Sequence, residues 1–162
     1  MEYERLEHSF PPVWDENSTI LILGSFPSVK SREEGFFYGH PRNRFWDVLA
    51  RILNTAKPVS IPEKKNLLLS HGIALWDVIA SCEIKGSSDS SIRNVTANDF
   101  TELLACSHVT KIYTNGQTAG RLYQKYAQKK TGLESVVLPS TSPANAAYSL
   151  DKLLLYWRQI RE

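Results

Sequence analysis

The feature that most limits the fold of this chain is a short apolar run that ends at a glycine. Every residue from 19 to 23 is apolar or β-branched. A continuous run of this kind is typical of a strand that is buried on both faces of a sheet. The next residues, Gly24-Ser25-Phe26-Pro27-Ser28, predict a loop. Because open α/β sheets bind ligands in loops at the carboxyl ends of their strands, we expect the functional site to begin here.

Strand and helix signals alternate along the rest of the chain. Apolar runs predict further strands at residues 73–78, 111–114 and 135–138, and periodic patterns predict helices at residues 43–53, 64–70, 98–105, 116–129 and 145–161. This alternation predicts an α/β fold, a three-layer α/β/α sandwich around a mostly parallel central four-stranded sheet. The loops after the first, third and fourth strands then share one edge; they hold residues 24–28, 115–117 and 139–146.

Length and composition are those of one globular domain over residues 1–162, with 42% hydrophobic and 22% charged residues. No apolar run approaches the ~20 residues that a membrane-spanning helix needs. The charged N-terminal segment lacks the apolar core of a signal peptide. We therefore expect a monomeric protein of the cytoplasm, acting at the nucleoid of a bacterium or archaeon, with no membrane partner.

Cysteine usage and charge exclude few functions. Cys82 and Cys106 are too few for a four-thiolate iron–sulfur site and match no zinc motif, so we expect two reduced thiols and no metal. The net charge of +2 does not by itself indicate nucleic-acid binding. Basic side chains do cluster around the first loop, where they suit phosphate groups: Lys30, Arg32, Arg42 and Arg44.

Two further segments carry the polar and aromatic groups of a binding site. Residues 35–46 read Gly-Phe-Phe-Tyr-Gly-His-Pro-Arg-Asn-Arg-Phe-Trp, with a helix expected from about Pro41. Residues 140–146 read Ser-Thr-Ser-Pro-Ala-Asn-Ala and precede the last predicted helix. Rings, amides and free backbone N–H groups at one spot suit a flat heterocycle beside a phosphate backbone. No glycine-rich nucleotide-binding fingerprint accompanies them.

In their order along the chain, these segments resemble the uracil-DNA glycosylase superfamily. Residues 24–27 are similar to the Gly-X-X-Pro that ends the first strand in that family. Residues 40–46 are close to the His-Pro-X-Asn-Arg-Phe-Trp of the mismatch-specific uracil glycosylases. Residues 140–146, called the late loop below, occupy the place of the loop that the family inserts into the DNA minor groove. The resemblance spans residues 19–147 and implies cleavage of an N-glycosidic bond in DNA without a metal or organic cofactor.

Three departures from the mismatch-specific pattern point to another branch. Phe26 stands where those enzymes have a catalytic asparagine. Ser140 replaces the histidine that opens the late loop in the best-known uracil enzymes, and Ala144 replaces its leucine wedge. Such differences resemble the hypoxanthine-DNA glycosylase (DNA-deoxyinosine glycosylase) branch, whose catalytic asparagine corresponds to Asn43. The resemblance implies a monofunctional base-excision-repair enzyme whose partner is DNA with deaminated bases: hypoxanthine, with uracil as a second candidate.

The resemblance assigns roles to the motif residues. Asn43 is the expected catalytic residue; Ser25, Phe26, Tyr38 and Asn115 are expected to bind the base; Arg42, Ser140, Ser142, Pro143, Ala144 and Asn145 are expected to contact DNA. The residues alone leave open whether these positions act on DNA or only support the fold. Several of these positions could instead serve the fold, as a helix cap, an Asn-Gly turn, a helix-entry turn or packed rings: Asn43, Asn115, Ser142, Phe26 and Tyr38.

The expected chemistry follows from these roles. The Tyr38 ring would stack on the flipped base, and the backbone N–H of Phe26 would donate a hydrogen bond to a carbonyl oxygen of the base. Asn43 would place water or stabilise the cation-like sugar through its amide oxygen, because an amide is a poor general base. Ser142 and a following helix N-terminus would grip a phosphate. A uracil-preferring enzyme of the same superfamily and a catalytically silent nucleic-acid-binding module are the alternatives. We expect the polar segment 85–94 to be a solvated surface loop.

Overall fold

A parallel sheet of four strands forms the centre of the molecule. The computed structural model describes residues 2–161. The sheet has the order β3-β2-β6-β7, with strands β2 (Ile20–Gly24), β3 (Ile73–Asp77), β6 (Lys111–Asn115) and β7 (Ser135–Leu138). All three strand pairs are parallel, so the carboxyl ends of the strands share one edge. The four predicted strands and their parallel arrangement are confirmed.

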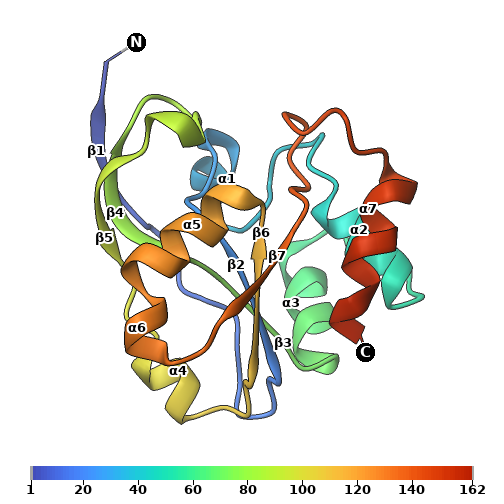
Figure 1. Cartoon of the computed structure of the whole chain (residues 1–162). Coiled ribbons are helices and arrows are strands. Elements are labelled where there is room, and N and C mark those ends of the chain that lie inside the picture. The colour runs from blue at the N-terminus through green and yellow to red at the C-terminus, as the bar shows by residue number, and fades with distance from the viewer. Residues whose placement is uncertain (1, 162) are drawn as a thin grey trace.

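Helices cover both faces of this sheet (Figure 1). On one face lie α2 (Phe45–Ile52), α3 (Ile61–Ser70) and α7 (Leu150–Trp157). On the other lie α4 (Thr101–Ala105), α5 (Gln117–Tyr126) and α6 (Gln128–Thr131). The predicted α/β/α sandwich is therefore confirmed.

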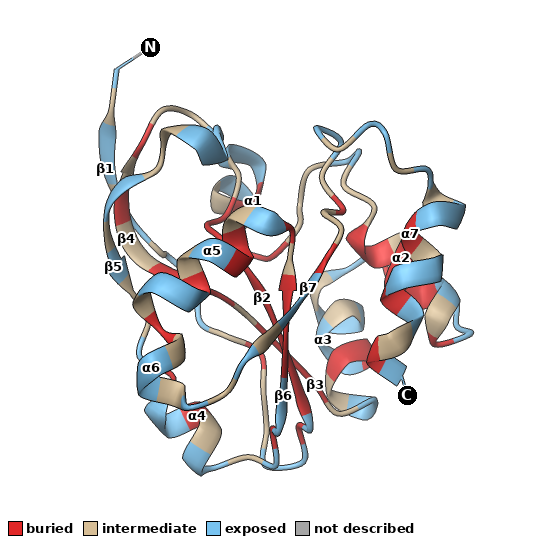
Figure 2. Cartoon of the chain, viewed as in Figure 1, coloured by how far each residue is buried: buried red, intermediate tan, exposed pale blue. Residues whose placement is uncertain are grey.

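The core is divided by the central sheet into two halves. Alternate side chains of β2 enter opposite halves: Ile20 and Ile22 pack with the rings around α2, whereas Leu21 and Leu23 pack toward α4 and α5. Every residue of β2 is buried, as its unbroken apolar pattern predicts. Figure 2 shows this strand in the buried centre of the molecule.

A second, antiparallel sheet was not predicted. It has the order β1-β4-β5, with strands β1 (Glu4–Glu7), β4 (Ile79–Ile84) and β5 (Arg93–Ala97). Only Val78 separates β3 from β4, so the chain passes directly from one sheet to the other. Because its outer strands carry many charged and exposed residues, these segments lack the apolar runs that revealed the parallel strands.

Several helix boundaries differ from the predictions. The helix expected at 116–129 is two helices, α5 and α6, that meet at Ala127. The last helix begins at Leu150 after the cap Ser149, not at residue 145, and ends in a 3₁₀ turn, Arg158–Arg161. The helix expected at 98–105 begins only at Thr101, and α3 begins three residues earlier than expected. The six-residue helix α1 (Val29–Glu34) was not predicted.

Two sequence expectations about the thiols and the membrane can be compared with the structure. Cys82 and Cys106 are both free, the first buried and the second exposed. Within residues 2–161, no helix combines the length and apolar character needed to cross a bilayer.

Candidate functional site

A cleft of about 660 Å³ opens at the carboxyl edge of the parallel sheet. The loops after β2, β6 and β7 meet there, as predicted, together with the segment before α2. Nine of the predicted site residues line it: Ser25, Phe26, Tyr38, Asn43, Asn115, Ser140, Ser142, Pro143 and Ala144. Arg42 is an exposed residue of the neighbouring turn, and Asn145 uses its side chain within the late loop. The predicted residues therefore come from four distant segments to one place.

Asn43 serves the fold through one end of its amide. Its Oδ1 accepts a hydrogen bond from the backbone N–H of Phe45 at 2.9 Å and one from the Thr141 hydroxyl at 2.8 Å. The first bond satisfies a free N–H at the start of α2, although Arg44 and not Asn43 stands at the N-cap position. Because both donors need an oxygen, the orientation of the amide is fixed. The nitrogen, Nδ2, is left as the group that can meet a ligand in the cleft.

Thr141 connects two of the predicted residues. Asn115 donates from Nδ2 to the Thr141 hydroxyl at 3.0 Å and accepts from the Thr141 backbone N–H at 3.0 Å. Since the same hydroxyl donates to Asn43, one chain of hydrogen bonds joins the end of β6, the late loop and the start of α2. Thr141 is completely buried. Asn115 therefore positions the late loop, whatever further contact it makes.

Tyr38 lies at the inner end of the cleft in a left-handed backbone conformation, with φ of 54°. Its ring stacks on Phe45, with centroids 4.2 Å apart and planes 23° from parallel. Its hydroxyl oxygen is buried. Burial raises the pKa of Tyr38 far above the ordinary range; the negative charges of Asp77 and Asp89 add to the rise, and the Asn115 amide opposes it. The hydroxyl is therefore neutral at physiological pH and can donate a hydrogen bond.

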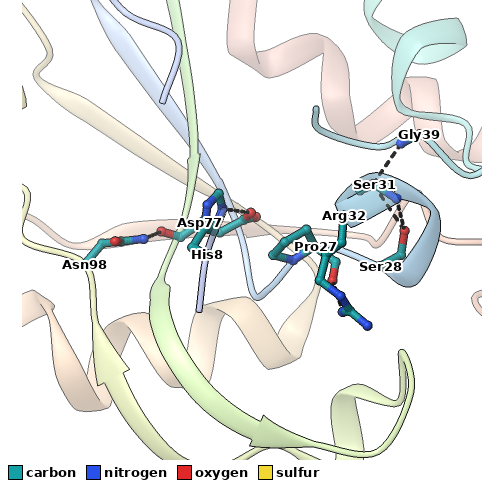
Figure 3. Close-up of polar contacts among 8 residues, drawn as sticks. All are labelled: His8, Pro27, Ser28, Ser31, Arg32, Gly39, Asp77 and Asn98. Atoms are coloured by element: carbon teal, nitrogen blue, oxygen red, sulfur yellow. Dashed lines mark hydrogen bonds and ion pairs between the residues drawn. The ribbon is translucent and has the colours of Figure 1, made fainter. Parts of the chain in front are cut away.

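The loop after β2 is held by α1 and by Val78, the residue between β3 and β4. Val78 N–H donates to the Gly24 carbonyl at 2.8 Å, and Arg32 Nη1 donates to the Pro27 carbonyl at 2.8 Å. Ser31 Oγ accepts from the Gly39 N–H at 2.9 Å, which ties α1 to the segment before α2 (Figure 3). The loop that carries Ser25 and Phe26 is therefore fixed from both sides before any ligand arrives.

Asp77 is a cleft residue that the sequence interpretation missed. It ends β3 beside Gly24, and its side chain is 5% exposed. Figure 3 shows Asp77 between His8 and Asn98: His8 Nε2 lies 2.7 Å from Asp77 Oδ2, and Asn98 Nδ2 donates to the Asp77 carbonyl at 2.9 Å. A carboxylate at the end of a parallel strand was a usable signal. His8 gave none, because it lies in a charged segment far from every motif.

The segment 85–94 is not only a solvated loop, which corrects the expectation for it. It contains a 3₁₀ turn, Asp89–Ser91, and leads into β5 at Arg93. Ser25 Oγ donates to Asp89 Oδ1 at 3.0 Å, and Asp89 lines the cleft although much of the residue is exposed. Desolvation of its carboxylate raises the pKa of Asp89; the Ser25 bond lowers it, and the Asp77 charge raises it.

The late loop has a compact internal structure and does not open a helix. Ser142 Oγ accepts from Ala144 N–H at 3.1 Å, and Asn145 Nδ2 donates to the Ser140 carbonyl at 3.0 Å. The helix N-terminus expected directly after Ser142 is wrong, because α7 begins only at Leu150. Any phosphate contact of Ser142 must therefore use its hydroxyl hydrogen and not a helix end.

Arg44 clamps this loop from the start of α2. Its guanidinium donates to the carbonyls of Ser142 at 3.1 Å, Asn145 at 3.2 Å and Tyr148. Its backbone N–H donates to the Thr141 carbonyl at 3.1 Å. Arg44, which belongs to the segment 35–46, thus holds the shape of the late loop.

These features define a class of protein: a three-layer α/β protein with a preformed polar and aromatic cleft at the carboxyl edge of its sheet. The comparison with known families is more specific. The profile of the uracil DNA glycosylase superfamily matches residues 11–161, nearly the whole chain. The chain belongs to the uracil DNA glycosylase superfamily.

Individual relatives match along almost their full length. A protein from Methanosarcina acetivorans named hypoxanthine DNA glycosylase is 38% identical over 149 residues, 91% of this chain and 93% of that protein. One of the same name from Methanosarcina barkeri is 34% identical over 141 residues, 86% and 88% of the two chains. The solution NMR structure of a Methanosarcina acetivorans protein, described as a candidate uracil DNA glycosylase, matches with a TM-score of 0.78 at 34% identity, covering 94% and 97% of the two chains.

Proposed function

We propose that this protein is a monofunctional DNA glycosylase that hydrolyses the N-glycosidic bond of hypoxanthine in deaminated DNA. The observation that carries the proposal is the cleft itself, in which amide, hydroxyl and aromatic groups from all three family motifs converge. The names of two relatives that match most of the chain support hypoxanthine as the base.

In the reaction, the C1′–N9 bond breaks and its electron pair leaves with the base. A water oxygen attacks C1′ and loses a proton to solvent, and the departing base takes up a proton from solvent. Flipping the nucleotide costs a few kcal/mol, and least for a mispaired base such as hypoxanthine. The Tyr38 ring, supported from behind by Phe45, and the Phe26 wall would offset part of this cost by stacking.

Asn43 acts in this scheme through its amide nitrogen, because its oxygen already accepts two hydrogen bonds. Nδ2–H can donate to the departing base as negative charge grows on it, or hold the attacking water. Both roles fit a group that positions and polarises but does not remove a proton. This changes the role expected from sequence, in which the amide oxygen faced the reaction.

The charges of the cleft favour the proposed transition state. Asp77 and Asp89 place two carboxyl groups around the pocket, and negative charge stabilises a cation-like sugar. The same charges repel phosphates, so phosphate contacts belong to the rim, where Arg42 is exposed and Ser142 is half-buried. Contacts of that kind position the DNA without choosing the base.

A lyase step through a Schiff base is not part of the proposal. Lys30 lines the cleft, but its side chain is 46% exposed and its ammonium nitrogen lies 3.9 Å from Glu34 Oε1. A Schiff-base lysine is activated by burial in a desolvated pocket, whereas this side chain is half exposed. We expect no covalent enzyme–DNA adduct when borohydride is added during turnover.

The test is single-turnover release of free base from labelled duplexes that contain hypoxanthine, uracil or xanthine, each also as a single strand. Release of hypoxanthine supports the proposal. Release of uracil in clear preference to hypoxanthine would instead support the uracil-specific alternative. Tight binding to every substrate with no release would identify a silent binding module.

A further inference from the structure

The two outer strands of the parallel sheet differ in how their free edges are covered. At one side, Val13 bridges β3: its N–H donates to the Leu75 carbonyl at 2.9 Å, and the Leu75 N–H donates back at 2.9 Å. At the other side, β7 pairs with β6 along its inner edge, and no strand or bridge within residues 2–161 lies along its outer edge. An uncovered strand edge is a template for pairing with a further strand.

The hydrogen bonds of β7 show which backbone groups its outer edge offers. The Gly116 N–H donates to the Leu138 carbonyl at 2.8 Å, so Leu138 faces β6. Because residues of a parallel strand turn their N–H and C=O groups to either side in alternation, Val136 also faces β6, and Ser135 and Val137 face outward. Within the described chain, these outward groups make no hydrogen bond. Two donors and two acceptors are therefore open to an incoming strand.

Grooves flank this outer edge on both faces of the sheet. On the α5 side, a groove of about 370 Å³ lies between that helix and Val137, which is 49% exposed. On the opposite face, a groove of about 270 Å³ is bordered by Val136, which is 43% exposed, and by Gln159. Successive side chains of an extended segment point to opposite faces. A segment added beside β7 would therefore place alternate side chains in the two grooves.

Positive charge surrounds the outer edge. Arg121 lines the first groove, where its guanidinium makes only a 3.4 Å bond to Thr118 Oγ1, and Lys111 lines the second groove. Glu134, at the start of the strand, borders both grooves and is the acidic exception. Residues 117–131, which contain α5 and α6, include no carboxylate and four exposed cationic side chains: Arg121, Lys125, Lys129 and Lys130.

We propose that the outer edge of β7 binds an extended acidic segment of a partner protein, which adds to the parallel sheet as a further strand. Main-chain hydrogen bonds to Ser135 and Val137 supply affinity, and alternate side chains supply specificity. Acidic side chains face Arg121 in the first groove, and apolar side chains cover Val136 in the second. The acidic residues belong opposite the carboxyl-terminal half of β7, because Glu134 repels them at its start. This interaction is additional to base excision.

A second copy of this chain and DNA both fit the outer edge less well than an acidic peptide does. Pairing two β7 strands around a two-fold axis would bring α5 of each copy to the same face of the joined sheet, so like charges would meet across the axis. DNA would meet the cations but has no matching series of donors and acceptors for the backbone of Ser135 and Val137. An acidic extended peptide satisfies both features.

The probe is a capped heptapeptide of alternating Asp and Val, titrated into the ¹⁵N-labelled protein, with alternating Lys and Val as the charge control. The Asp peptide should shift the amide signals of Ser135 and Val137 and slow their hydrogen exchange, which is fast in the free protein because neither N–H is bonded. An Asp peptide that leaves these two amides unchanged overturns the proposal, whether or not it contacts α5 and α6. Protection of the same amides that grows with protein concentration alone would identify a second copy as the occupant and overturn it as well.

Two variants test the backbone and the charge separately. Val137→Pro removes an outward N–H but no bond to β6, so the protein should stay folded while affinity for the Asp peptide falls roughly tenfold or more. The matched control Val137→Thr keeps the N–H and the β-branched shape and should bind as wild type does. Arg121→Glu should weaken the Asp peptide by roughly three- to tenfold and strengthen the Lys peptide. Wild-type affinity in folded Val137→Pro, or an unchanged preference for the Asp peptide in Arg121→Glu, overturns the proposal.

Discussion

Asn43 divides its amide between the fold and the substrate. Oδ1 accepts from Phe45 N–H and from Thr141, so the oxygen caps α2 and joins the late loop. Nδ2 remains for the reaction. The sequence alone left open whether Asn43 supports the start of the helix or acts in catalysis. The two roles are compatible, because the two ends of its amide can serve one each.

Two variants separate these roles. Asn43→Ala should lose about 1 kcal/mol of unfolding free energy through the cap and about 10²–10³ in single-turnover rate through the missing donor. Asn43→Ser can still cap α2 with its hydroxyl but has no amide nitrogen. Denaturant unfolding and hypoxanthine release should show stability restored in the Ser variant and activity still lost. Recovery of both together would reduce Asn43 to a structural cap.

The raised pKa of Asp89 predicts that the stability and the activity of the protein depend on pH. Desolvation raises its pKa in the folded protein, so the folded state holds this proton more tightly than the unfolded chain does. Ionised Asp89 therefore costs stability above its raised pKa, and Asp89→Asn should stabilise the protein at neutral pH but not in acid below the ordinary aspartate range. If the ionised group supports catalysis, the wild-type rate falls as pH drops through the raised pKa.

The matching measurement is the pH profile of single-turnover hypoxanthine release. Asp89→Asn should be slower at neutral pH and should lack the acidic limb that wild type shows. The same acidic limb in both proteins would assign that limb to another group.

The late loop keeps a defined shape because Arg44, at the start of α2, is hydrogen-bonded to it. The Arg44 guanidinium donates to two of its carbonyls and to that of Tyr148 just beyond it, while Arg42, two residues earlier, is exposed on the adjoining turn. Arg44 is thus a structural arginine and Arg42 a phosphate-binding candidate. Their closeness in sequence makes them a matched pair for experiment.

Arg44→Ala should lower unfolding free energy by roughly 2 kcal/mol, because it leaves several carbonyls without a charged donor. It should also weaken binding to abasic-site duplex at every salt concentration. Arg42→Ala should leave stability unchanged and reduce the slope of log affinity against log salt by about 1. Calorimetry and salt titration check both; equal stability loss in the two variants would contradict the distinction.

Strands that are buried on both faces could be predicted from sequence, and exposed ones could not. Residues 19–23 form an apolar run because both core halves pack on β2. Strand β5 has no such run, since its residues are exposed or half-buried. The start of α7 was placed too early because Ser142-Pro143 imitates a helix entry, whereas Ser149 provides the actual cap.

At the scale of the whole molecule, the residues of the motifs could be predicted from sequence, but the residues from other segments that contact them could not. Parallel strands bring residues 24–28, 115 and 140–144 to one edge, which the sequence order implies. His8 reaches Asp77 only because β1 pairs with β4, and β4 continues from β3. That route depends on an antiparallel sheet without a clear sequence signal, so His8 and Asp89 became visible only in the folded chain.

The central claim is hydrolysis of the N-glycosidic bond, and its most direct measurement is the fate of a water oxygen. A duplex with one deoxyinosine is incubated with the protein in H₂¹⁸O, and the products are analysed by mass spectrometry. We predict free hypoxanthine without ¹⁸O, an abasic sugar that carries ¹⁸O at C1′, and a strand that stays intact until alkali is added. A strand break without alkali, or a substrate recovered with its hypoxanthine still attached, would contradict the claim.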